Sequence, residues 1–75
     1  MTSSETALSI QINGEPQDVP AGLSIADLLR RLGRDPEVPG IAVALGGGVV
    51  PRAKWSDTLV EDGADVEIVT AIQGG

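Results

Sequence analysis

Residues Ser24-Ile-Ala-Asp-Leu-Leu-Arg-Arg-Leu-Gly33 carry the signals of a short amphipathic helix with two defined ends. Ser24 is a favoured N-cap, and Asp27 at the third helical position can complete a capping box with it. Apolar residues recur at helical spacing and form one stripe, namely Ile25, Leu28, Leu29 and Leu32. Two arginines in the last turn and Gly33 beyond it suit a helix C-terminus. We therefore predict a single helix whose apolar stripe packs against one face of a sheet.

Short strand-like segments lie on both sides of this helix. Before it, Leu8, Ile10 and Ile12 alternate with polar residues, which is the pattern of a half-buried strand. Asn13-Gly14 follows, and this pair is the strongest short hairpin signal. The return strand would run from Glu15 to Val19, at a sheet edge because Pro16 lacks the N–H that a central strand must donate.

After the helix, the five apolar residues from Ile41 to Leu45 predict a buried strand. Gly46-Gly47-Gly48 is a turn, and a further short strand at 49–50 is ended by Pro51. Residues 55–60 are ambiguous, and a last strand is expected from about Asp65 to Ile72.

The expected order is hairpin, helix and three strands. It predicts an α+β fold, a mixed sheet of four to five strands with one main helix on one face. With the first and last strands side by side in the centre, this is the β-grasp (ubiquitin-like) arrangement. The 75 residues fit one domain, in which we expect residues 1–6 and 73–75 to be mobile.

Composition excludes several classes of function. The chain has no Cys and no His, so it lacks a thiolate nucleophile and the commonest general base and zinc ligand. Its 5 basic and 11 acidic residues give a net charge of −6, which argues against nucleic acid and anionic membranes as partners. Gly46-Gly47-Gly48 lacks the Lys-Ser/Thr of a phosphate loop. We expect a cytoplasmic protein that is not an enzyme and binds no metal or cofactor itself.

The C-terminus offers a chemical function. A Gly74-Gly75 ending has no side chains, so it can enter a narrow channel in another protein. The terminal carboxylate is ionised and a poor electrophile at neutral pH, but an ATP-consuming partner could activate it as an acyl-adenylate. Ile72 and Gln73, beside this tail, are then candidates for contact with that partner.

The second half of the chain resembles a known family. Its motifs are Ile41-Ala-Val-Ala-Leu45, Val49-Val-Pro-Arg52 with Trp55 three residues on, Asp62-Gly-Ala-Asp65 and the final Gly74-Gly75. In this ordered set the chain is similar to the ThiS family, the small β-grasp sulfur carrier proteins of thiamine biosynthesis. The departures concern turns: Gly46-Gly47-Gly48 stands where the family often has Asn-Gly, and Ala64 interrupts its usual Asp-Gly-Asp.

The resemblance implies a cycle centred on Gly75. An adenylyltransferase related to ubiquitin-activating enzymes would adenylate its carboxylate with MgATP. A cysteine desulfurase or another sulfur relay protein would then convert it to a thiocarboxylate, which passes sulfur to thiazole synthase. Gly74 would permit insertion of the tail, and the protein would be a cosubstrate of these enzymes.

Other functions share these features. The small subunit of molybdopterin synthase has the same fold and ending, a protein modifier would use the same activation step, and an interaction module would have an inert tail. Trp55 is either a partner contact or a lid on the core whose indole N–H reaches a backbone carbonyl. Arg52 is either a contact for a partner's carboxylate or a solvated charge.

Overall fold

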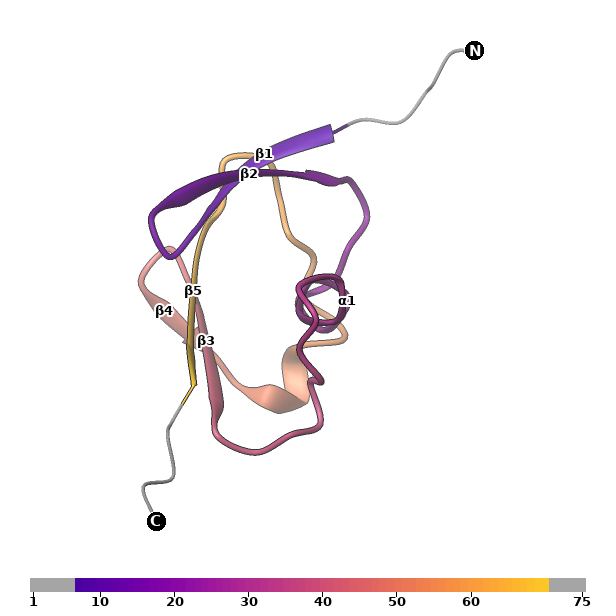
Figure 1. Cartoon of the computed structure of the whole chain (residues 1–75), viewed down its shortest axis with the longest axis vertical. Coiled ribbons are helices and arrows are strands. Elements are labelled where there is room, and N and C mark those ends of the chain that lie inside the picture. The colour runs from indigo at the N-terminus through magenta and orange to yellow at the C-terminus, as the bar shows by residue number, and fades with distance from the viewer. Residues whose placement is uncertain (1–6, 71–75) are drawn as a thin grey trace.

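The computed structural model describes residues 7–70, and these form a mixed sheet with a helix across one face (Figure 1). The elements are β1 (Ala7–Ile12), β2 (Glu15–Pro20), α1 (Ile25–Arg31), β3 (Ile41–Leu45), β4 (Gly48–Val50), the 3-10 helix η1 (Arg52–Lys54) and β5 (Asp65–Thr70). The strands follow the order β2-β1-β5-β3-β4, with β1 and β5 parallel and the other pairs antiparallel. The predicted sheet of four to five strands, with the first and last strands adjacent, is confirmed, and it contains five strands.

The first hairpin forms where Asn13-Gly14 predicted it. Both residues have positive φ, 53° at Asn13 and 85° at Gly14, which a tight turn of this kind requires. The turn sets the register so that Ile12 lies opposite Glu15. β2 is an edge strand, which is compatible with Pro16 inside it.

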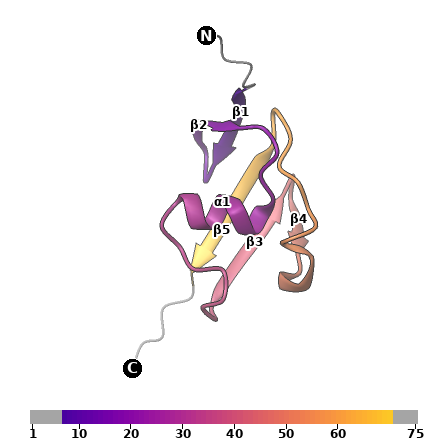
Figure 2. The ribbon, with the colours of Figure 1, turned by 90° about the vertical axis from the view of Figure 1, so that its right-hand side faces the viewer.

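The helix begins with the predicted capping box. The Ser24 hydroxyl accepts a hydrogen bond from the Asp27 N–H at 3.1 Å, and the Asp27 carboxylate accepts one from the Ser24 N–H at 3.2 Å. Figure 2 shows α1 lying across one face of the sheet. The apolar stripe of the helix packs there, with Ile25, Leu28 and Leu29 fully buried. Leu32 is the C-cap, and Gly33 follows with a φ of 82°.

The core lies between α1 and the sheet face that the helix covers. Apart from Trp55 it is aliphatic, because the chain has no Phe or Tyr. Its other members are Leu8, Ile10, Ile12, Val19, Ile25, Ala26, Leu28, Leu29, Val43, Val60, Val66 and Ile68. No helix within residues 7–70 is long and apolar enough to cross a membrane.

The structure corrects the expectation for residues 41–45. The apolar run was expected to be buried throughout, but only Val43 is buried and Ala42 is exposed. The reason is that one helix covers one face only, whereas a strand buried on both sides needs a layer on each face of its sheet. Residues 55–60 form no strand, although Leu59 makes an isolated bridge with Ser24. The predicted extension of the last strand to Ile72, and the expected mobility of residues 1–6 and 73–75, lie outside the described residues.

Candidate functional site

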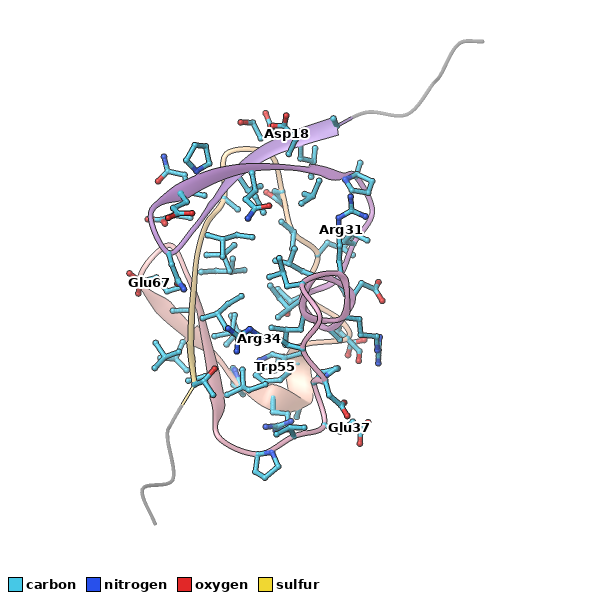
Figure 3. The ribbon with its side chains drawn as sticks, viewed as in Figure 1. Asp18, Arg31, Arg34, Glu37, Trp55 and Glu67 are labelled. Carbon is cyan, nitrogen blue, oxygen red and sulfur yellow. The ribbon has the colours of Figure 1, made fainter. Side chains whose placement is uncertain are left out.

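The described part of the candidate site is the point from which the C-terminal tail departs. The predicted tail residues Ile72, Gln73, Gly74 and Gly75 lie outside the described residues. The central strand β5 is described as far as Thr70, which we call the tail root. Thr70 lies opposite Ile41 in β3, and its hydroxyl accepts a hydrogen bond from Arg34 Nη1 at 2.8 Å. Figure 3 shows Arg34 reaching toward β5 from the segment that follows α1. The tail root is therefore fastened by a neighbouring strand and by a side chain.

Trp55, a candidate partner contact, closes the lower part of the core (Figure 3). Its side chain is only 3% exposed, and its indole Nε1 donates to the Val50 carbonyl oxygen at 2.8 Å. A buried indole with a satisfied N–H is the arrangement that the sequence offered as the alternative to a partner contact. In this conformation Trp55 has almost no surface to present to another protein.

Arg52 binds backbone, a role that the sequence did not indicate. Its guanidinium group lies 4.7 Å from the centroid of the Trp55 ring, at a distance typical of a cation–π contact. The same group donates to the carbonyl oxygens of Pro36 and Val38, the second at 2.8 Å. A planar fork of N–H groups suits two nearby acceptors in this way. Arg52 and Trp55 together form what we call the Arg52–Trp55 clasp, which holds the segment between α1 and β3.

The sheet face turned away from α1 is not covered by any element within residues 7–70 (Figure 1). Toward β1 and β2 it is polar, with Ser9, Gln11 and Asp18, and we call this the polar half. Over β3, β4 and β5 it carries apolar side chains, namely Ala42, Ala44, Val49 and Val69. We call this second part the apolar half; Val49 is 77% exposed and Val69 61%.

Acidic groups border the apolar half. Asp65 and Glu67 precede Val69 at alternate positions of β5, and Figure 3 shows Glu67 pointing away from the helix. None of the described strands contains a Lys or an Arg. This face therefore has an apolar centre with negative charge beside it, which is complementary to an apolar surface flanked by basic groups.

Sequence reasoning missed three polar contacts around the central strands. The Asn13 side chain accepts from the Ile68 N–H at 2.8 Å and donates to the Ile68 carbonyl at 3.1 Å, extending the β1–β5 pairing beyond the end of β1. The Asp62 carboxylate accepts from the Ser9 N–H at 2.8 Å. Arg34 holds the tail root. Only Asn13 had a sequence signal, and that signal predicted the turn alone.

The described residues offer no constellation for catalysis. A shallow hollow of about 420 Å³ lies between α1, η1 and the segment that joins α1 to β3, and Arg30, Arg52, Trp55 and Pro36 are among the residues that line it. Within residues 7–70 no three His, Cys, Asp or Glu side chains come together as a set that could hold a metal ion. The candidate functional features that remain are the C-terminal tail predicted from the sequence and the described surfaces around the tail root.

The comparisons with known proteins all indicate the same family. A model of the ThiS family matches residues 10–75. The chain is 31% identical over 68 residues to the sulfur carrier protein ThiS of Escherichia coli, a match that covers 91% of this chain and 100% of that protein. The crystal structure of the thiamine biosynthesis protein ThiS from Geobacter metallireducens superposes with a TM-score of 0.75 at 30% identity, covering 91% of this chain and all of the other. A thiazole synthase of Magnetococcus marinus is 34% identical over 68 residues, which are 20% of its length.

Proposed function

Because this chain belongs to the ThiS family, the sulfur carriers of thiamine biosynthesis, we propose that Gly75 is the residue that carries the sulfur. The observation that supports this assignment most directly is that the family match continues to residue 75 and so includes the Gly74-Gly75 ending. The central strand β5 is paired with β1 on one side and with β3 on the other, and it is described as far as Thr70, five residues before Gly75.

The chemistry proceeds in two stages, neither catalysed by this chain. The Gly75 carboxylate attacks the α-phosphorus of MgATP on an adenylyltransferase, pyrophosphate leaves, and an acyl-adenylate forms. The terminal sulfur of a persulfide on a cysteine desulfurase or another relay protein attacks the acyl carbon and displaces AMP. A thiol then cleaves the S–S bond of the resulting acyl disulfide, which releases the C-terminal thiocarboxylate and leaves a disulfide on the donor side. Gly74 allows the tail to enter the enzyme because it has no side chain. The nucleotide and the magnesium ion are bound by the partner, and we place the cycle in the cytoplasm.

Thiazole synthase is the acceptor of this sulfur. The thiazole synthase of Magnetococcus marinus contains a stretch similar to 91% of this chain, and a second such protein from Paramagnetospirillum magneticum is related to the same extent. Joining two modules in one polypeptide raises the concentration of each at the other, which is useful when they act on one another. These relatives favour thiamine over the molybdopterin alternative and over a protein modifier.

The face with the apolar half supports docking of the activating enzyme. A Gly-Gly ending has no side chains by which an enzyme could distinguish one carrier from another, so recognition must come from the body of the protein. Val49 and Val69 offer an exposed apolar centre close to the tail root, and Glu67 lies beside them. A partner surface with an apolar centre and basic residues around it would match this chemistry.

Intact mass spectrometry tests the assignment of Gly75. The full chain is incubated with MgATP, a ThiS-activating adenylyltransferase and a sulfur source. We expect a mass increase equal to the exchange of one oxygen atom for sulfur, localised to Gly75 by fragmentation. A matched variant with one alanine added after Gly75 should remain unmodified, because its carboxylate lies one residue too far along. Equal modification of both proteins, or of neither, would contradict the proposal.

A further inference from the structure

Residues 34–40, which we call the helix-exit loop, join α1 to β3 without regular secondary structure, yet they are held at several points. Arg34 binds the tail root, and Arg52 donates to the carbonyls of Pro36 and Val38. Within the loop, Asp35 accepts hydrogen bonds from the N–H groups of Glu37 and Val38 through its carboxylate and its carbonyl, at 2.9 and 3.1 Å. A loop tied down in this way loses little further entropy when a partner binds it.

The loop holds one apolar residue toward solvent. Pro36 is buried and anchors the loop to the core, whereas the Val38 side chain is 46% exposed. Exposed Asp35 and Glu37 precede it. An exposed valine beside two carboxylates repeats the chemistry of the apolar half, where Val69 lies two residues from Glu67. The same kind of partner surface therefore fits both places.

The loop lies at the end of the molecule from which the tail departs, as both ribbon views show (Figures 1 and 2). Val38 precedes Ile41 by three residues, which span at most about 11 Å, and Ile41 lies opposite the tail root. The five residues after Thr70 span at most about 18 Å when fully extended. A protein that receives the Gly75 carboxylate must approach within that distance of Thr70, where the loop is its neighbour.

We propose that the helix-exit loop is a second docking element for the enzyme that adenylates Gly75, with Val38 as its apolar contact. The helix-exit loop joins α1 to β3 at the end of the sheet where β5 reaches Thr70, and the apolar half reaches the same end through Val69 (Figure 1). One enzyme that encloses the tail therefore contacts both. The Arg52–Trp55 clasp is a positioning device, which fixes the loop before the enzyme arrives. This inference rests on the proposed function, because it assumes that Gly75 is adenylated.

The experiment compares three full-length chains in carrier-dependent ATP–pyrophosphate exchange with a ThiS-activating adenylyltransferase. They are the unaltered chain, Val38→Asp and a control, Leu59→Asp. Leu59 is 58% exposed and borders the same hollow as Asp65, at the far end of β5 from Thr70. We expect Val38→Asp to raise KM for the carrier about tenfold, as loss of a contact residue does, with kcat unchanged. Leu59→Asp should leave both values unchanged.

Arg52→Lys tests the positioning device, since it keeps the charge but loses the planar fork. We expect a KM increase of about threefold, smaller than that of Val38→Asp, with unchanged kcat and faster amide hydrogen exchange at Val38. Unchanged KM together with faster exchange would show that the clasp serves the fold alone and would overturn this part of the proposal.

The outcomes separate the two proposals. Absence of exchange with the unaltered chain would overturn adenylation of Gly75 itself. An active unaltered chain with a Val38→Asp variant that matches Leu59→Asp would overturn only the role of the loop. If Val38→Asp left adenylation unchanged but slowed sulfur transfer to thiazole synthase, the loop would belong to the later enzyme, and the assignment made here would be wrong.

Discussion

The polar half and the apolar half share one face of one sheet, and neither is covered by a helix. In β1 the buried residues alternate with Ser9 and Gln11, so the uncovered side of that strand carries polar side chains that are well solvated. In β3, β4 and β5 the apolar residues continue onto the uncovered side, where Val49 and Val69 are mostly exposed. The first pattern satisfies the fold alone. The second places more apolar surface outside than the fold uses, and this surplus is the basis on which we proposed docking of the activating enzyme.

The largest expected effect is on stability, and it compares the side of β1 that α1 covers with the side that it leaves uncovered. Ile10→Ala removes a buried side chain facing α1 and should lower the free energy of unfolding by about 3 kcal/mol. Gln11→Ala, at the next position of β1 but on the polar half, should change it by less than about 0.5 kcal/mol. Urea unfolding of both variants measures the difference. Equal losses would mean that the polar half is packed and that the comparison is invalid.

The next prediction concerns docking. Val69→Asp should raise the carrier KM of the activating enzyme about tenfold, because a charge replaces an apolar contact in the apolar half. Its cost to folding should stay below about 1 kcal/mol, since the side chain is mostly exposed. Gln11→Asp places the same carboxylate in the polar half and should leave KM unchanged. If both variants raised KM alike, net charge would explain the effect and the two halves would not differ.

A third comparison uses two serines. Ser24→Ala removes the N-cap of α1 and should cost about 1 kcal/mol of stability. Ser9→Ala in the polar half should be neutral, because the contact of Ser9 with Asp62 uses its backbone N–H, which alanine keeps. Thermal unfolding at one pH and salt concentration compares them. A destabilising Ser9→Ala would reveal a role for its hydroxyl group that the structure does not contain.

The smallest effect is electrostatic. Glu67→Gln should raise the carrier KM by about twofold at low salt, as expected for an exposed charge at the rim of an interface. The difference should disappear near 0.5 M salt, where the screening length falls to about 4 Å. Asp18→Asn, in the polar half, serves as the control and should not change KM at either salt concentration.

The sequence predicted the features whose causes are local. The capping box joins residues three apart, and the Asn13-Gly14 turn joins two adjacent strands, so both could be predicted from the sequence. It predicted the wrong burial for residues 41–45, because a run of five apolar residues does not tell whether one or both faces of its strand will be covered. That depends on how many other elements are available to form a second layer.

Two interpretations of Arg52 followed from the sequence, and neither included the partners that it binds in the structure. They are backbone carbonyls 14 and 16 residues away, and a carbonyl looks the same in every residue. The contact between Arg34 and Thr70 spans 36 residues and carried no signal for the same reason. The residues that shape the surroundings of the tail root could therefore be found only from the fold, whereas the assignment of Gly75 was proposed from the sequence.

The carboxamide of Asn13 gives the molecule a point of chemical ageing. Asparagine followed by glycine is the dipeptide most prone to lose ammonia, and here the nitrogen that would be lost is the one that donates to Ile68. Hydrolysis would leave a negative oxygen facing a carbonyl oxygen, so a bond between the two middle strands would become a repulsion. A stored preparation should thus weaken first at the junction between β1 and β5, the earliest and the latest strands of the chain.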